Sequence, residues 1–501
     1  MSDLLAENKA LKTLLSSQAQ TISDLQFQLA QLQKLIYGSK RERFIPDQDP
    51  TQGRLFDVPA QEAAPLSGPV KKEETTKQSS KRKPPKRNTF PEKLKREKQT
   101  LLPPDIDTQN LTQIGADITE LLAYQPASLY VKQIIRPRFV DKQAEERGVF
   151  QHPIPERLIP QGMVDESLIA QLIVEKIQFH TPLYRFGKKL KQAGVDVVSN
   201  NNLNNWFHKA AQAILPVYHL LQDEMLSQPY NQADETPIPV LTKDKPGATH
   251  RGYMWALHNV AHKTVFFHYA PSRATAAAAD LLKDYSGILQ TDGYEVYERL
   301  QKNKGFTLIH CMAHARRKFV DAQGMESEKA DFFLKKVQRL YRIERKARDQ
   351  QMDHSARYAL RQKEALPILL ELKNWLKTQM ETGLLPKSPF GKAVAYAYKR
   401  WEGLMAYTHD GQLEIDNNLI ENSIRPLALG RKNYLFAGSH DAAQSLACLY
   451  SIIGTAKRHG LNTHKYLTWL LRQVAQHKVD QQAINWLPHR MNPEELAPFL
   501  L

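Results

Sequence analysis

The stretch between Tyr230 and Phe319 constrains the fold more than any other part of the sequence. Short runs of β-branched and aromatic residues alternate there with Gly, Pro and polar residues, which is typical of strands joined by turns. Three such runs come first and predict an antiparallel meander. A helix, a fourth strand, a short helix, a fifth strand and a third helix are expected to follow. The expected strands are Pro237–Val240, Tyr253–Leu257, Thr264–His268, Gly287–Thr291 and Phe306–His310, and the expected helices are Arg273–Tyr285, one beginning at Tyr294, and Ala313–Phe319.

This order of strands and helices is that of an RNase H-like core, a mixed five-stranded sheet with helices. Residues 321–410 then break the pattern with helical sequence rich in Leu, Lys, Arg and Gln, and the core pattern resumes by Asp416. We therefore predict a multidomain, α-rich α+β chain. Its RNase H-like core is interrupted by an all-helical insertion, and an N-terminal coiled coil and a helical DNA-binding region precede the core.

Several domains are expected, because 501 residues exceed what one hydrophobic core usually organises. Shifts in composition and periodicity set the predicted boundaries. We predict a coiled-coil dimerisation helix at 1–44, a basic disordered linker at 45–100, a small strand-rich module at 101–150, a helical, helix-turn-helix-like DNA-binding region at 151–228, the first part of the RNase H-like core at 229–320, the helical insertion at 321–410, the second part of the core at 411–460 and a C-terminal helical tail at 461–501.

Heptad repeats in residues 3–37 indicate a coiled coil. Leucine at the d positions and a single asparagine, Asn8, at an a position favour a parallel dimer, because the buried amide fixes the register. A helix that packs on its own domain and an oligomer larger than a dimer are the alternatives. The leucines at d are Leu4, Leu11, Leu25 and Leu32, and the apolar a positions are Leu15, Ile22, Leu29 and Ile36.

The formal net charge of +16 favours polyanionic partners, nucleic acid first and an anionic membrane surface second. A membrane partner is not expected, because no run approaches the roughly 18 consecutive apolar residues of a spanning helix. Residues 71–98 hold twelve Lys or Arg against four Glu, a net of +8, and almost nothing to bury. This tract is either a solvated tether or a basic arm that follows DNA phosphates through Lys81, Arg82, Lys83, Lys86 and Arg87.

Two cysteines, Cys311 and Cys448, are too few for a disulfide framework, so a reducing cytoplasm is the expected location. The N-terminus also lacks the charged-then-apolar pattern of a signal peptide. Cys311 and His314 lie three residues apart, but the sequence offers no partners that would complete a zinc site. A packing role, or a role in supporting other ligands, is therefore expected for both.

Residues 165–227 show helical periodicity. Within them a turn at Gly194 separates two helices, and Ser199 is expected to cap the second. The arrangement resembles a helix-turn-helix, and this interpretation makes the lysines of the first helix DNA contacts. Two packed helices with polar exteriors are the alternative. The lysines concerned are Lys188, Lys189 and Lys191.

Three carboxylates, Asp234, Asp292 and Glu421, are the candidate catalytic residues. In the expected sheet Asp234 lies on the first strand and Asp292 at the end of the fourth, adjacent and parallel strand, while Glu421 comes from a helix beside them. Phosphodiester transfer needs an activated oxygen nucleophile and a stabilised leaving oxygen, and two divalent ions held by carboxylates supply both. Each residue also has a structural interpretation: a solvated strand end for Asp234, a turn with Gly293 for Asp292, and a capping box begun by Asn418 for Glu421.

Basic and polar residues near these carboxylates are expected to hold DNA phosphates. One group follows Glu421 and precedes a strand-like run, Tyr434–Ala437. The other lies on the helix after the fifth strand. An exposed charged surface without a partner is the alternative for both groups. The first consists of Arg425, Arg431, Lys432 and Asn433, and the second of Arg316, Arg317 and Lys318.

Five stretches resemble the insertion sequence 66 family of bacterial DDE transposases. They are ADETP at 233–237, TDGYEVY at 291–297, HCMAHARRKF at 310–319, SPFGKAVAYA at 388–397 and DNNLIENSIRPLALGRKNYLFAGS at 416–439. The resemblance covers nearly the whole chain and implies that Asp234, Asp292 and Glu421 are the catalytic triad. Members of this family often carry a cysteine-bearing, zinc-finger-like module after the basic linker. Residues 100–145 contain no cysteine, so zinc is not expected there.

The expected function is that of a DNA transposase. The triad would hold two Mg²⁺ ions, with Mn²⁺ tolerated, for strand cleavage and 3′-hydroxyl strand transfer at the ends of a mobile element. The expected partners are double-stranded DNA, further copies of this chain and small accessory proteins of the same element, and DNA binding implies association with the bacterial nucleoid. The alternatives are a two-metal nuclease without joining activity and a catalytically silent DNA-binding regulator derived from a transposase.

Overall fold

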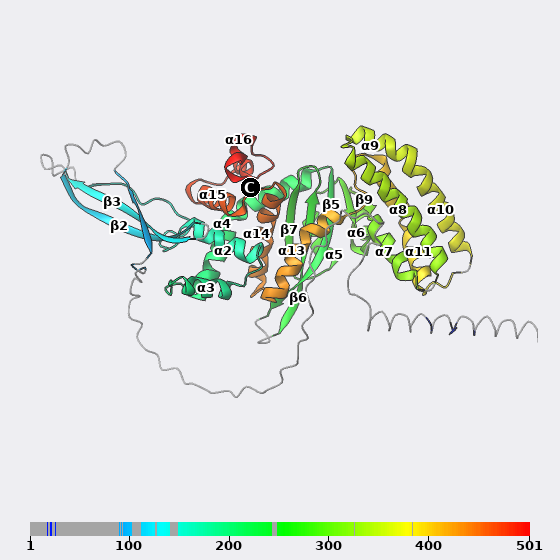
Figure 1. Ribbon diagram of the computed structural model, residues 1–501, viewed down its shortest axis with the longest axis horizontal. Helices are drawn as coiled ribbons and strands as arrows, with labels where there is room; N and C mark the ends of the chain where they lie inside the picture. Colours follow the sequence, from blue (N-terminus) through cyan, green and yellow to red (C-terminus); the bar gives the residue numbers. More distant parts are fainter. Residues whose placement is uncertain are drawn as a thin grey trace, which may run out of the picture. The chain divides into compact units, whose positions relative to one another are not determined.

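The computed structural model describes residues 18, 21, 22, 26, 90, 92, 94–102, 112–125, 128–140, 149–242, 248–324, 326–382 and 384–500 (Figure 1). The chain divides into two units, Met1–Asn88 and Thr89–Leu501. The four described residues of the first unit are helical. The rest of the predicted coiled coil lies outside the described residues, and so do Lys81, Arg82, Lys83, Lys86 and Arg87. The coiled coil and the basic arm therefore stay predictions.

The second unit begins with a small sheet. Its strands are β1 (Lys95–Thr100), β2 (Thr112–Gln125), β3 (Ser128–Val140) and β4 (Val149–Gln151). β1 pairs with β3 in parallel, whereas β2 and β4 pair with it in antiparallel fashion. These strands confirm the strand-rich pattern expected between 112 and 140, but β1 falls within the expected linker. Its sequence, KREKQT, buries almost nothing. Backbone pairing at the edge of the sheet therefore holds β1, and apolar contacts do not.

Three helices follow: α2 (Glu166–Ile177), α3 (Leu183–Gln192) and α4 (Asn200–Ser227). Ser199 caps α4 by accepting a hydrogen bond from the backbone nitrogen of Asn202, as predicted. Gly194 adopts a φ of 83° in the turn between α3 and α4, a conformation that favours glycine. The face of α4 that carries Leu203, Trp206 and Phe207 is buried.

The five-stranded sheet contains β5 (Tyr230–Leu241), β6 (Thr249–Asn259), β7 (Thr264–Ala270), β8 (Ile288–Thr291) and β9 (Thr307–His310). Its order is β7-β6-β5-β8-β9. β5, β6 and β7 are antiparallel, whereas β5, β8 and β9 are parallel. The meander and the pairing of the first strand with the fourth are as predicted. The connecting helices are α5 (Thr275–Leu281), α6 (Glu295–Gln301) and α7 (Met312–Ala322).

The predicted helix Arg273–Tyr285 is shortened at both ends in α5. Arg273 instead pairs with Glu235 on β5, and the hydroxyl of Tyr285 donates to the carbonyl of Ile288 at 2.6 Å. Arg273 and Tyr285, at the two ends of the predicted helix, thus bind β5 and β8 and do not extend α5.

The chain between β9 and the return to the sheet is helical, as expected. It forms α8 (Ser327–Asp349), α9 (His354–Leu360), η3 (Arg361–Ala365), α10 (Leu366–Glu381), α11 (Pro389–Lys399), α12 (Trp401–Met405) and η4 (Ala406–His409). These elements share a hydrophobic cluster with α7 and β9. Within it Phe319 and Phe333 stack with their ring centroids 3.7 Å apart. The insertion therefore has its own core, which is anchored on the edge of the sheet.

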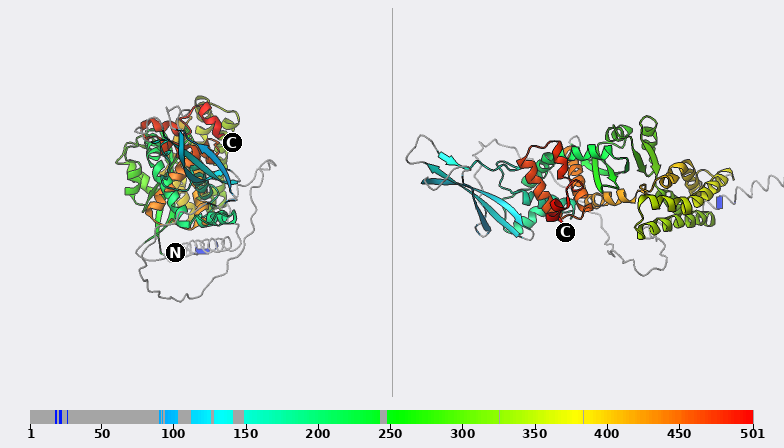
Figure 2. Two further views of the ribbon diagram at one scale, coloured as in Figure 1. Left: turned by 90° about the vertical axis from the view of Figure 1, so that its left-hand side faces the viewer. Right: turned by 90° about the horizontal axis from the view of Figure 1, so that it is seen from above.

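The chain then returns to the sheet through α13 (Asn418–Tyr434) and α14 (His440–Arg458) (Figures 1 and 2). α13 packs on β5 and β6, and α14 packs on β7. Ser451 on α14 accepts a hydrogen bond from the backbone nitrogen of Phe267 at 2.8 Å, so α14 covers an edge strand. The last elements are α15 (Thr463–Gln476), η5 (Gln481–Trp486), α16 (Pro493–Leu496) and η6 (Ala497–Phe499). Among the described residues, no helix combines the length and apolar character that a bilayer crossing requires.

The strand-like run expected at Tyr434–Ala437 is wrong in its first part. Tyr434 is instead the last residue of α13. Its ring is buried, and its hydroxyl lies 3.2 Å from that of Tyr450 on α14. Ala437 makes an isolated parallel bridge with Val240 at the end of β5.

Candidate active site

Asp234 lies within β5, and Asp292 is the first residue after β8, the neighbouring parallel strand. The last paired residues of β5 and β8 are Gln232 and Gln290, and each aspartate follows its glutamine by two positions. Residues two apart on a strand lie on the same face, and neighbouring strands are about 4.8 Å apart. The two aspartates therefore lie near each other at the carboxyl end of β8. Glu421 reaches the same region from the first turn of α13.

The three carboxylates share one electrostatic environment. Burial raises the pKa of Asp234 well above its usual value, and the negative charges of Glu235, Asp292 and Glu421 raise it further. A hydrogen bond from the backbone nitrogen of Glu235 to Oδ1 of Asp234 at 2.8 Å opposes this only in part. The negative charges of three neighbouring carboxylates thus act together on Asp234.

Glu421 is partly buried, and its Oε1 atom has no hydrogen-bond partner. Among the ion pairs of the described residues, its partner is His314 on α7, whose Nε2 lies 3.6 Å from Oε1, and not Arg425. Burial lowers the pKa of His314, and the charges of Asp292 and Glu421 oppose that shift. His314 is therefore a neighbour of the candidate site whose role the sequence pattern left open.

The capping box begun by Asn418 is wrong. Asn417 is the residue before the helix, and its side chain makes no capping hydrogen bond, while Asn418 is already the first helical residue. Asn418 instead donates from its side chain to Oδ2 of Asp416 at 2.9 Å. Oδ1 of Asp416 also accepts from the backbone nitrogen of Asn418 at 3.1 Å, and Oδ2 accepts from the hydroxyl of Tyr341 at 2.8 Å. Asp416 thus shapes the turn before α13, and Glu421 is left free of a capping role.

The two glutamines that precede the aspartates hold the start of α13. Gln232 donates to the carbonyl of Asp416 at 2.9 Å and accepts from the backbone nitrogen of Ile420 at 3.2 Å. Gln290 donates to the carbonyl of Glu414 at 2.7 Å. The strands that carry Asp234 and Asp292 therefore also set the position of Glu421. The shared spacing of Gln and Asp on both strands was a signal of this in the sequence.

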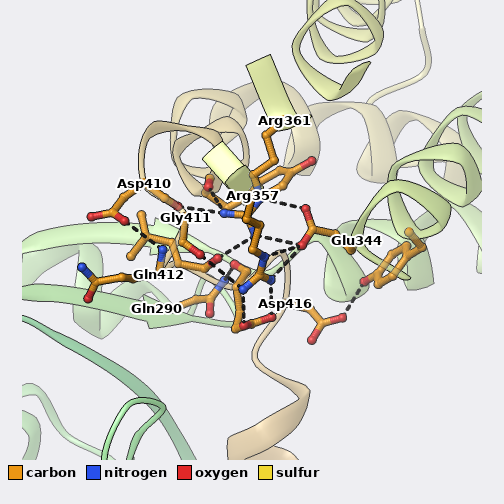
Figure 3. A network of polar contacts seen from close by, with 12 residues as sticks. Gln290, Glu344, Arg357, Arg361, Asp410, Gly411, Gln412 and Asp416 are labelled. Atoms are coloured by element: carbon orange, nitrogen blue, oxygen red, sulfur yellow. Dashed lines mark hydrogen bonds and ion pairs between the residues drawn. The ribbon is translucent and has the colours of Figure 1, made fainter. Parts of the chain in front are cut away.

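A buried ionic network links the insertion to the same segment (Figure 3). The guanidinium of Arg361 donates five hydrogen bonds. Two go to the carboxylate of Glu344, and three go to the backbone carbonyls of Tyr407, Asp410 and Leu413. Arg357 bridges Glu344 on α8 to Glu414, with nitrogen–oxygen distances of 2.7 to 2.9 Å. Burial opposes the ionisation of Glu344, but the hydrogen bonds and charges of both arginines outweigh it and lower its pKa.

The insertion also contacts the loop of Asp292. The hydroxyl of Tyr396 on α11 donates to the carbonyl of Asp292, and Arg400 donates to the carbonyl of Gly293 at 3.0 Å. Gly293 has a φ of 88°, and a Cβ atom there would lie 2.6 Å from Nε of Arg400. Glycine is thus required in this turn by both backbone conformation and space.

Glu235 is a further charged residue that the sequence pattern did not single out. Its side chain is fully buried and pairs with Arg273, and it accepts a hydrogen bond from Tyr297 at 3.1 Å. Arg273 in turn lies 3.8 Å from the ring centroid of Tyr294. Arg273 offsets the charge of Glu235 only in part, because burial still raises the pKa of Glu235. The signal for this residue in the sequence was its position directly after Asp234.

The expected DNA contacts differ in their surroundings. Arg425, Lys432 and Asn433 are exposed on α13, and Lys318 is exposed on α7 beside Arg316 and Arg317. Arg431 donates to Thr236 Oγ1 at 2.8 Å and to the carbonyl of Pro237, so it ties α13 to β5. Lys188 and Lys191 are exposed on α3, whereas Lys189 pairs with Glu175 at 2.9 Å. Their contacts with DNA stay predictions.

The donors of the site suit an oxygen-preferring divalent cation. They are carboxylates, one oxygen of Glu421 lacks a partner, and like charges crowd Asp234. Histidine and thiolate ligands are not needed, and Cys311 is buried with its sulfur accepting from the backbone nitrogen of Asn417 at 3.4 Å. Within the described part of the chain, no three His, Cys, Asp or Glu side chains are gathered closely enough to enclose one ion. A cation bound here would therefore need ligands besides these side chains, such as substrate phosphate and water.

Comparison with known families gives two matches. The family described as "Transposase IS66 family" matches residues 161–445, which include all three carboxylates. The family described as "Transposase C of IS166 homeodomain" matches residues 24–98.

Similar proteins come from Sinorhizobium fredii (strain NBRC 101917 / NGR234). "Uncharacterized protein y4jD" is 31% identical over 474 residues, which cover 90% of this chain and 91% of that protein. "Uncharacterized protein y4qI" is 28% identical over 514 residues, with 98% and 93% covered. No solved structure matches the chain.

Proposed function

Because the chain belongs to the IS66 family of transposases, we propose that it cuts DNA at the ends of a mobile element and joins these ends to target DNA. The main support is that the negative charges of Asp292, after a neighbouring strand, and of Glu421, in the first turn of α13, both act on Asp234. The strand order β7-β6-β5-β8-β9 supports an RNase H-like core that contains them. Residues 327–409 then form the insertion in this core.

The three carboxylates would hold two Mg²⁺ ions, or Mn²⁺ in their place. Such ions, when bound, activate an oxygen nucleophile and stabilise the leaving oxygen of a phosphodiester. Asp234 offers a half-buried carboxylate from within β5, Asp292 one from the residue after β8 and Glu421 one from α13. The chain's own contribution is to hold these groups fixed, through Gln232 and Gln290 on the core side and through the buried arginines of the insertion.

Two phosphoryl transfers follow from this arrangement. In the first, a water oxygen bonds to phosphorus while the bond from phosphorus to the 3′-oxygen breaks and leaves a 3′-hydroxyl. In the second, that 3′-hydroxyl attacks a target phosphodiester, and the 3′-oxygen of the target strand leaves. Arg425 and Lys432, exposed on α13, and Lys318 on α7 are suited to hold the phosphates that flank the reacting one. One phosphodiester is broken and one is formed in the joining step, so no energy source is required.

Asp292→Asn tests the proposal, because it removes one charge at constant shape. With Mg²⁺ and DNA that carries the element ends, we expect cleavage to fall by more than about 100-fold, the upper end of the loss seen when a group that supports a metal ligand is removed. Asp284→Asn, at an exposed aspartate of the same domain, is the matched control and should cleave normally. Normal cleavage by Asp292→Asn would show that the triad is wrongly assigned.

The joined product separates a transposase from a nuclease with the same carboxylates. Labelled element ends incubated with target DNA should give strands that are longer than the input. Cleaved ends without joined strands would favour the two-metal nuclease, and binding without cleavage would favour the silent regulator. We further propose that the chain acts in the bacterial cytoplasm as an oligomer assembled through residues 1–44, with accessory proteins of the element. Loss of joining after deletion of 1–44, with DNA binding retained, is the expected result.

A further inference from the structure

The turn after α13 has an unusual backbone. Leu435 has φ 66° and ψ −49°, and the backbone nitrogen of Phe436 donates to the carbonyl of Tyr434 at 2.8 Å. These angles and this hydrogen bond define a classic γ-turn, which is rare and strained. A branched residue such as leucine is disfavoured in this region, where glycine would be free of strain. Strain of this kind is characteristic of functional sites.

Contacts on both sides fix this turn. The backbone nitrogen of Leu435 donates to the carbonyl of Arg431 at 3.0 Å. Ala437 donates to the carbonyl of Pro239 at 2.8 Å and accepts from the backbone nitrogen of Leu241 at 2.9 Å. The turn is therefore held between the end of α13 and the end of β5, so the two side chains at its tip are presented in a fixed direction.

Those two side chains are apolar and exposed. Leu435 is 62% exposed and Phe436 is 40% exposed, and Leu429, one turn and a half earlier on α13, is 46% exposed. Exposed Arg425 and Lys432 lie on the same helix. An apolar tip beside exposed cations is suited to a polyanion that also offers apolar faces, and DNA bases have such faces.

The distance along α13 relates this tip to the candidate catalytic residue. Leu435 follows Glu421 by fourteen positions. At a rise of about 1.5 Å per residue the two lie about 21 Å apart along the helix. At about 3.4 Å per base step, this is about six base pairs of duplex.

We propose that Leu435 and Phe436 form an apolar wedge that inserts between bases of the bound DNA, about six base pairs from the phosphate that is cut. This inference rests on the proposed function, because it takes DNA lying along α13 as the substrate. Arg425 and Lys432 hold phosphates between the cut site and the wedge, and the wedge unstacks one base step. The two tip residues offer too little area for a stable protein interface, which buries about 800 Å² on each partner.

The test places 2-aminopurine, whose fluorescence rises when it is unstacked, at successive positions from about three to about nine base pairs from the cut. With wild-type protein we expect a several-fold rise at one or two neighbouring positions. The variant Leu435→Gly/Phe436→Ala should lose that rise and bind end-bearing DNA about 10-fold more weakly. The dependence of its binding on salt should be unchanged, because phosphate contacts are intact. Glycine at 435 relieves the turn, so the variant is expected to fold.

Leu370→Ala, at a leucine of similar exposure on α10, is the matched control and should keep the fluorescence rise. Wild-type protein that cleaves and joins without any rise would overturn the wedge and leave the proposed function standing. A rise without cleavage would support the wedge and overturn the proposed function. A variant that changes the oligomeric state in light scattering but keeps the rise would assign the tip to a protein contact and overturn the wedge.

Discussion

The Nε2 atom of His314 lies 3.6 Å from the Oε1 atom of Glu421. The two residues come from α7 and α13, which are about a hundred positions apart in the chain. Asp292, the residue after β8, lies close enough for its charge to act on His314. Oε1 of Glu421 has no other partner in the described structure. The imidazole is therefore placed to orient this carboxylate.

His314→Ala should lower the rate of DNA cleavage by about 10- to 100-fold, because groups that orient a metal ligand contribute on that scale. The concentration of Mn²⁺ needed for half-maximal cleavage should rise at the same time, which a purely structural role would not cause. His219→Ala, at an exposed histidine of α4, is the control. An unchanged Mn²⁺ requirement in the His314 variant would argue against an orienting role.

Asp234→Asn should abolish cleavage but raise the melting temperature of the metal-free protein. Because the pKa of Asp234 is raised, the folded state holds its proton more tightly than the unfolded state does. Protonated Asp234 thus stabilises the folded state at low pH, and this stabilisation is lost as the pH rises through the pKa that Asp234 has in the folded state. The difference in melting temperature between variant and wild type should grow as the pH rises above the ordinary pKa range of an aspartate. Mg²⁺ should stabilise the wild type more than the variant, and an equal effect on both would remove Asp234 from the proposed site.

Glu344→Gln should lower the free energy of unfolding by about 3–5 kcal/mol, because it leaves two buried arginines without their shared carboxylate. Strand transfer should fall as well, since the network holds the segment that leads into α13. The control is Glu381→Gln in the same insertion, whose partner Lys377 is exposed, and its cost should stay below about 1 kcal/mol. Urea unfolding of both variants measures the difference, and a cost for Glu344→Gln as small as that of the control would contradict this account.

Gly293→Ala should reduce cleavage and destabilise the protein by about 1–3 kcal/mol, because alanine is strained at a φ of 88°. The new Cβ atom would also displace Arg400 and with it the loop of Asp292. Arg400→Ala added to this variant should make room for the new Cβ atom, but the strained backbone of residue 293 would remain. Cleavage and stability should therefore recover only in part. Gly305→Ala, where a Cβ atom meets nothing within 4 Å, is the control for both cleavage and thermal unfolding.

Local patterns predicted most of the sheet and its helices. Alternating strands separated by turn residues between Tyr230 and Phe319 gave the correct meander and the correct fourth and fifth strands. The helical cap at Ser199 followed from local chemistry and is found in place. β1 was missed because its charged sequence carries no apolar pattern, and its pairing with β3 is a nonlocal contact.

The amino-acid sequence alone was enough to select the candidate metal ligands and to predict where they lie along the chain. It gave the three carboxylates, the basic residues around them and the family to which the chain belongs. Tertiary structure alone decided that Glu421 faces His314 and not Arg425, that Asn417 and not Asn418 precedes α13, and that Arg431 binds β5. Each of these depends on contacts between residues that are distant in the chain, and such contacts outweigh the weak local preferences that a sequence pattern expresses.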